Sequence, residues 1–170
     1  MNTHLPAIKK IKIDSKDNVE ITMIETVIVP PKEKDGESRS ITNVYAAQCQ
    51  HKPHEDFLAA LLSLRKYALE ICEFDAATKN EYKVSSLVIS GDMDKQQSRV
   101  MFSISKWVKS LGKPVNISTP QVTMYGEEYA NAKAMTKQID KVIEEAFLYL
   151  GGKNAEALQL SFNFVMKKAA

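Results

Sequence analysis

The sequence has few of the residues that mark secreted or membrane proteins. Only two cysteines occur in 170 residues, so reduced thiols are a simpler interpretation than a disulfide framework. No apolar run approaches the roughly 20 residues that a membrane-spanning helix needs. The first residues also lack the apolar core of a signal peptide. These shortages predict a cytoplasmic protein that does not associate with membranes.

Catalytic motifs are also missing from the sequence. Gly91 and Gly112 stand alone in turn-like stretches, so no glycine-rich phosphate loop is present. Neither a G-x-S-x-G nucleophile motif, an H-E-x-x-H metal motif nor a paired-carboxylate motif stands out. We therefore expect a protein that is not an enzyme and that uses no cofactor.

The overall charge excludes a uniformly basic protein. The chain carries 23 basic and 21 acidic residues, a net charge of +2, so any nucleic-acid surface has to be a local patch. The composition, 44% hydrophobic and 26% charged, is typical of a globular protein rather than a disordered tail. At this length, one domain with a sizeable core is expected.

Two segments show the spacing of amphipathic helices. The first covers residues 54–74, and the second covers about 127–150 and ends at Gly151-Gly152, where a left-handed cap is expected. Their apolar stripes predict that both helices pack on one sheet. The residues expected to be buried there are Leu61, Leu64, Ile71, Ile139, Val142 and Ala146.

Six stretches show the pattern of strands. They cover residues 9–14, 19–29, 41–49, 82–90, 99–108 and, broken at Pro120, 115–124. In the first, charged and apolar side chains alternate, which predicts a half-buried edge strand whose lysines discourage further pairing.

The order of these elements predicts the fold class. Three strands and a helix are followed by three strands and a helix, which indicates an α+β fold of duplicated β-β-β-α units with a mixed antiparallel sheet and two helices. The expected repeats cover 9–74 and 82–152. Both lie in a single domain, 1–152, that is followed by a C-terminal tail, 153–170.

The strongest concentration of potential metal ligands is Cys49, His51 and His54. Thiolate and imidazole are groups that zinc favours. However, the C-x-H-x-x-H spacing matches no established site, and a fourth ligand would have to come from Cys72, Asp56 or elsewhere. We therefore predict that this cluster is not a metal site, and that it is instead a strand cysteine followed by histidines near a helix start.

The segment from Lys83 to Lys113 is rich in basic residues. It contains the only tryptophan, Trp107, on the strand face opposite Phe102 and Ile104. A basic strand with an aromatic among small polar residues offers phosphate contacts and a stacking surface to a single-stranded nucleic acid. The alternative is an ordinary solvated sheet face with Trp107 packed under a loop. The candidate nucleic-acid-binding residues are Lys83, Arg99, Lys106, Trp107, Lys109 and Lys113.

The tail contains a short pattern that permits two interpretations. The six residues from Gln159 to Phe164 look like the peptide by which bacterial replication and repair proteins dock into the sliding clamp. This resemblance implies a partner-binding role for Gln159, Leu160, Phe162 and Phe164. The second interpretation is an edge strand of the sheet, because apolar residues alternate from Leu158 to Phe164. This periodicity favours the strand over the peptide.

The whole chain resembles two groups of proteins. The doubled order of three strands and a helix is similar to that of whirly-type single-stranded DNA-binding domains, although those have more strands per unit. The general character also resembles small uncharacterised phage and prophage proteins encoded beside replication and recombination genes. We therefore expect an oligomeric single-stranded nucleic-acid-binding protein. The alternative is a non-enzymatic module for protein interaction or ligand sequestration.

Overall fold

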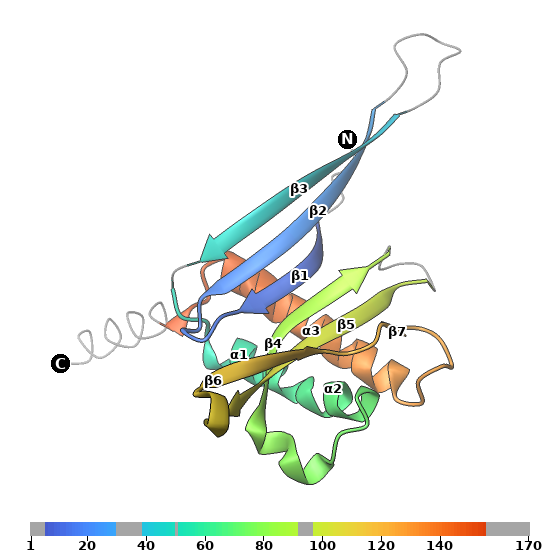
Figure 1. The fold of residues 1–170 in the computed structure, drawn as a ribbon. Coiled ribbons are helices and arrows are strands. Elements are labelled where there is room, and N and C mark those ends of the chain that lie inside the picture. Colours follow the sequence, from blue (N-terminus) through green and yellow to red (C-terminus); the bar gives the residue numbers. More distant parts are fainter. Residues whose placement is uncertain (1–5, 30–38, 50, 92–96, 156–170) are drawn as a thin grey trace, which may run out of the picture.

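The computed structural model describes residues 6–29, 39–49, 51–91 and 97–155. These residues form one antiparallel sheet with α1, α2 and α3 on one side of it (Figure 1). The α+β class, with an antiparallel sheet and helices on one side, is therefore confirmed. None of the helices in the described segments has the combined length and apolar character needed to span a membrane.

The sheet consists of two meanders that meet at its centre. The order across the sheet is β3-β2-β1-β4-β5-β6, and β7 pairs with β5 beside β6. The two meanders join through the antiparallel pair β1–β4. The strands are β1 (Ala7–Ile13), β2 (Val19–Val29), β3 (Arg39–Cys49), β4 (Tyr82–Ser90), β5 (Arg99–Val108), β6 (Lys113–Ser118) and β7 (Val122–Thr123).

The position of β1 corrects one expectation from the sequence. Its alternation of lysine and isoleucine predicted an edge strand, but β1 lies inside the sheet between β2 and β4. Ile8 and Ile11 are both buried under the helices because the register of β1 shifts between Ile8 and Lys10, and Lys10 and Lys12 lie on the other face on either side of Ile11. An interior strand tolerates these lysines because an antiparallel sheet can leave one face in water.

The first predicted helix is divided into α1 (Glu55–Ser63) and α2 (Arg65–Ile71), with the break at Leu64. The Ser63 hydroxyl donates a 2.6 Å hydrogen bond to the Ala60 carbonyl, a back-bond of the kind that bends helices. The bend keeps Leu64 fully buried.

The second helix, α3 (Ala132–Leu150), begins five residues later than the pattern predicted. Residues 127–131 form turns instead. The helix ends before Gly152, whose φ of +102° is the left-handed conformation that favours glycine. Two 3-10 turns, η1 (Ala76–Glu81) and η2 (Lys109–Leu111), complete the described elements.

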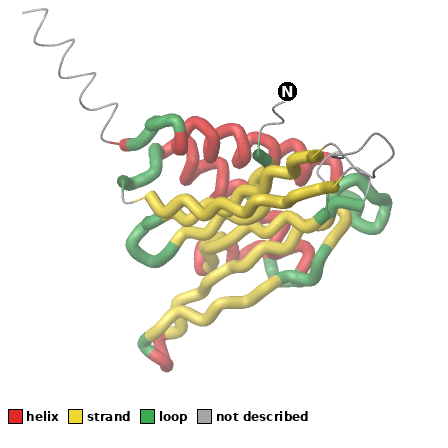
Figure 2. The backbone as a smooth tube through the Cα atoms, turned by 90° about the horizontal axis from the view of Figure 1, so that it is seen from above, coloured by secondary structure: helices red, strands yellow, loops and turns green. Residues whose placement is uncertain are grey.

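The core lies between the helices and one face of the sheet (Figure 2). As predicted, the helical stripe residues Leu61, Leu64, Ile139, Val142 and Ala146 are buried there, and Ile71 is partly buried. The sheet contributes Ile8, Ile11, Val19, Ile21, Tyr82, Leu87, Ile89, Val100, Phe102 and Ile104. The opposite face, which we call the open face, is not covered by any helix of the described residues.

Candidate nucleic-acid interface

The strand β5 divides its side chains between the two faces of the sheet. Val100, Phe102 and Ile104 are fully buried under the helices. Because successive side chains of a strand point to opposite faces, the residues between them lie on the open face. These are Arg99, Met101, Ser103, Ser105 and Trp107. The faces predicted for Phe102 and Trp107 are therefore confirmed.

The indole of Trp107 lies at the surface. It is 60% exposed, and its cross-strand partner is Pro114 on β6. A large aromatic ring at this exposure contributes little to the core, and it offers a flat apolar surface to a ligand. The interpretation in which Trp107 packs under a loop is wrong.

Lys83 is the basic residue closest to Trp107 on this face. It lies directly opposite Ser105, so the two side chains share the open face. Trp107 is two residues further along β5, which makes it the diagonal neighbour of Lys83. Such neighbours lie about 7–8 Å apart, within reach of long side chains. A cation and a stacking ring are therefore placed side by side.

Two more lysines on the open face were not among the sequence candidates. Lys10 lies opposite Val88 and Lys12 opposite Ser86, both on the open face of β4. Lys10 forms a 3.3 Å ion pair with Glu20 of β2. The alternation in β1 was the sequence signal for these two lysines, but they could be assigned to a shared face with β4 only once the strand pairing was known.

The open face carries an excess of positive charge. Among the described strand residues that the register places there, four are basic, namely Lys10, Lys12, Lys83 and Arg99. Glu20 is the acidic one. Between these charges lie small polar side chains, and the hydroxyls of Ser103 and Ser118 are 3.3 Å apart. This combination gives a polar, cationic surface with one exposed ring.

Lys106 does not belong to this surface. It alternates onto the helix-covered face, where its ammonium lies 2.5 Å from Glu81 and 5.2 Å from the centre of the Tyr82 ring. The hydrogen bond with Glu81 raises the pKa of Lys106 above its ordinary value. The sequence analysis grouped Lys106 with Trp107 by charge alone, although their adjacent positions put them on opposite faces.

The remaining basic candidates lie at one end of the β5–β6 hairpin. Lys109 is exposed at the start of η2, two residues after Trp107. Lys113 pairs with Val108, and the alternation of β5 places this pair on the helix side of the sheet. Lys109 can therefore extend the surface around Trp107, and Lys113 lies at its border.

The histidines of the possible metal cluster have other contacts. His54 is the N-cap of α1, and its Nδ1 accepts a 3.3 Å hydrogen bond from the backbone N–H of Asp56. The carbonyl of His51 accepts a hydrogen bond from the Tyr149 hydroxyl. Among the described side chains, which exclude that of Cys49, no group of three or more His, Cys, Asp or Glu could hold a metal ion.

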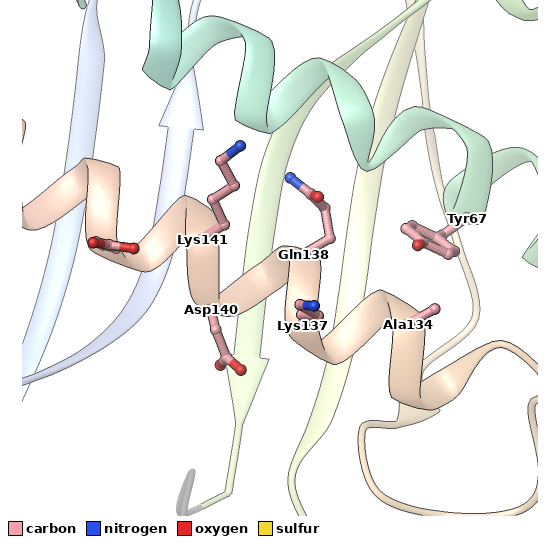
Figure 3. Close-up of a pocket in the computed structure, with 7 residues that line it drawn as sticks. Tyr67, Ala134, Lys137, Gln138, Asp140 and Lys141 are labelled. Atoms are coloured by element: carbon pink, nitrogen blue, oxygen red, sulfur yellow. The ribbon is translucent and has the colours of Figure 1, made fainter.

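A second surface feature is an open groove between α2 and α3 (Figure 3). Gln138 and Lys141 project from α3 toward α1 and α2, and Asp140 projects away from them. The Gln138 amide donates to the Ala60 carbonyl at 3.3 Å. The side chains of Lys137, Asp140, Lys141 and Glu144 that line the groove are exposed. Its lining is Tyr67, Ala134, Lys137, Gln138, Asp140, Lys141 and Glu144.

The candidate clamp-binding residues Gln159, Leu160, Phe162 and Phe164 lie outside the described residues. Comparison with protein-family models, curated proteins and solved structures finds no match for this chain. The open face therefore has to be interpreted from its own chemistry.

Proposed function

We propose that this protein binds single-stranded nucleic acid across the open face of its sheet. The observation that carries the proposal is the exposed indole of Trp107 next to Lys83, on a face with four basic residues and one acidic residue. Single-strand binders combine a cationic path for phosphates with aromatic rings on which bases stack. Both parts are present on one uncovered surface.

In this proposal each type of side chain has a separate role. Lys83, Arg99 and the β1 lysines neutralise phosphates, and Trp107 stacks on a base. Serine side chains between them leave room for the strand to approach the sheet. Since none of these groups selects a particular base edge, we expect binding with little sequence preference.

The arrangement of the sheet supports a second part of the proposal, that the chain contains two copies of one unit. Each meander, β1-β2-β3 and β4-β5-β6, is followed by helix on the same side of the sheet. We infer repeats over 9–74 and 82–152, as in the duplicated architecture of the whirly-type domains that the sequence resembles. A phage replication or recombination role and a homo-oligomeric state belong to this proposal.

A non-enzymatic interaction or ligand-sequestering module is the competing function. The groove of Figure 3 is the feature that such a module would use. The open face is the stronger candidate because its exposed aromatic ring has no role in the core, whereas the groove is lined mainly by charged and polar helix side chains.

The proposal can be tested with labelled oligothymidylate, alone and annealed to complementary oligodeoxyadenylate, over a series of salt concentrations. Trp107 is the only tryptophan, so quenching of the protein's intrinsic fluorescence reports on the proposed site itself. We expect preferential binding of the single strand, quenching of Trp107, and affinity that falls with salt. Absence of binding at low salt would overturn the proposal in favour of the interaction module.

A further inference from the structure

The outer edge of β3 lacks the usual protection of an edge strand. This strand of eleven residues pairs with β2 on one side only, among the described strands. It has no charged residue between Ser40 and Cys49. Natural edge strands are normally short, charged or interrupted by proline, because an open edge pairs with other chains. The strand at the opposite edge, β6, has six residues and includes Lys113 and Pro114, so β3 is the edge that is suited to pairing.

The hairpin of β2 and β3 carries exposed apolar side chains on the side of the sheet where the helices lie. Val19 and Ile21 of β2 are buried on this side. The same side continues to Val27, which is 40% exposed, and to its cross-strand partner Ile41, which is 49% exposed. Figure 1 shows that this part of the hairpin extends beyond the helices. The apolar pattern therefore continues past the end of the chain's own helix layer.

The other end of β3 lies next to the helix layer. The strand ends at Cys49, and two residues later the carbonyl of His51 accepts a hydrogen bond from the hydroxyl of Tyr149, which is in the last turn of α3. The strand therefore has one end beside α3 and the other end, where Ile41 is exposed, beyond the helices.

We infer that the free edge of β3 pairs with the β3 edge of a second copy of this chain, antiparallel and about a two-fold axis at Val44. Val44 is the middle residue of β3, so this register pairs both strands over their whole length. A closed two-fold dimer is also the commonest form of homo-oligomer. The inference rests on the homo-oligomeric state in the proposed function and is independent of the proposed nucleic-acid binding.

The strand is complementary to itself in this register. Directly opposite residues share a face, so Val44, which is 67% exposed on the open face, lies opposite Val44 of the second copy. On the helix side, Ile41 lies opposite the smaller Ala47. The other pairs are also uncharged, namely Ser40 with Gln48, Thr42 with Ala46 and Asn43 with Tyr45. Like charges, which destabilise directly opposite pairs, therefore do not meet between Ser40 and Gln48.

Antiparallel pairing also brings unlike ends of the two hairpins together. The end of β3 that extends beyond the helices lies beside the end of the second copy's β3 that is next to α3. Val27 and Ile41 are thereby placed on the side of the joined sheet where the second copy's helices lie. This fit of an uncovered end to a covered end favours a second copy over a strand of another protein. Both open faces then lie on the same side of one continuous sheet.

The first test is disulfide cross-linking of the full chain, without nucleic acid, after Cys49→Ala and Cys72→Ala. Val44→Cys places two thiols directly opposite, with roughly 4.5–5.5 Å between their Cα atoms, a distance that a disulfide spans. Ala46→Cys is the matched control on the same face, because its two copies are roughly 13 Å apart along the strands. We expect mild oxidation to link Val44→Cys chains into dimers and to link few Ala46→Cys chains. A mixture of Thr42→Cys and Ala46→Cys chains should cross-link again, since these two positions are opposite each other.

The second test is the mass of the protein in solution, measured by analytical ultracentrifugation. We expect the unmodified chain to have twice the 19.1 kDa of a single chain. Val44→Asp places two like charges opposite each other and should give monomers, and it should leave the fold intact because Val44 is exposed. Asn116→Asp, an exposed position on the other edge strand, is the control and should remain dimeric.

Three results would overturn the inference. They are a monomeric unmodified chain, a dimer that persists after Val44→Asp, and cross-linking through Ala46→Cys as strong as through Val44→Cys. Titration with oligothymidylate separates this inference from the proposed function. A monomeric chain that binds the single strand would contradict the β3 pairing alone, whereas a β3-linked dimer that does not bind it would contradict the nucleic-acid proposal alone.

Discussion

The two faces of the sheet use the same strands for different purposes. On β5, Phe102 and Ile104 are fully buried under the helices, while Ser103 and Ser105 between them lie on the open face. Burial of the first set stabilises the fold, and the second set contributes little to the core. Neighbouring residues are therefore expected to affect different properties, stability on one face and binding on the other.

The largest effect on stability is expected from a substitution on the covered face, which is the face of the sheet that packs against the helices. Leu64→Ala removes a fully buried side chain where α1 meets α2, and it should lower the free energy of unfolding by about 2–5 kcal/mol. Leu62→Ala, on the same helix but exposed, should change it by less than about 0.5 kcal/mol. Denaturant unfolding measures both. Equal unfolding midpoints for the two variants would show that the assignment of the covered face is wrong.

A smaller effect, on binding instead of stability, is expected from the open face. Trp107→Ala should weaken single-strand binding by about 1–3 kcal/mol through lost stacking, with little change in the thermal transition because the ring is exposed. Trp107→Phe should retain part of the affinity. Leu111→Ala, at another exposed apolar residue of the same hairpin, is the matched control. If Trp107→Ala unfolds the protein instead, it would be wrong that open-face residues affect binding without affecting stability.

Two lysines on opposite faces provide a finer comparison. Lys83→Ala should reduce the slope of log affinity against log salt by about 0.7, the value for one phosphate of a single strand. Lys106→Ala should leave the slope unchanged, because Lys106 is paired with Glu81 on the covered face. The measurement is a titration with oligothymidylate at several salt concentrations. Equal reductions for both lysines would indicate unspecific electrostatic attraction rather than a site on one face.

Local patterns explain what the sequence could predict. The strands Tyr82–Ser90 and Arg99–Val108 have the bounds that their alternation predicted, because a period of two is visible within a few residues. The same period already separated Lys106 from Trp107, so that error came from grouping residues by charge without regard to face. The break at Leu64 was missed because the apolar spacing from Leu61 through Leu64 to Ala68 continues across it without interruption.

The position of β1 could not be predicted in this way. Whether a strand is an edge or an interior strand depends on its partners, and β4, which pairs with β1, begins about 70 residues later in the chain. Lys10 and Lys12 were therefore interpreted as protection of an edge. Once the sheet order is known, Lys10 and Lys12 become part of the candidate interface, whereas β3, whose one charged residue is Arg39, lies at the edge among the described strands.

The smallest effect concerns the outer surface of the helix layer, where an ion pair should affect stability alone. The hydrogen bond from Lys153 lowers the pKa of Asp56 below its ordinary 3.8. The ionised pair therefore stabilises the folded state above that pH, and this contribution is lost as the pH falls through the lowered value. Asp56→Asn should lower the unfolding midpoint slightly at neutral pH, and the difference from the unmodified protein should vanish in acid once the pH is below the lowered pKa of Asp56. Because Lys153→Gln removes the partner, Asp56→Asn should have less effect in that background.

Single-strand binding at neutral pH should be the same in all of these variants, since α1 lies on the covered side. A change in affinity that accompanies the loss of this ion pair would mean that the two faces are coupled.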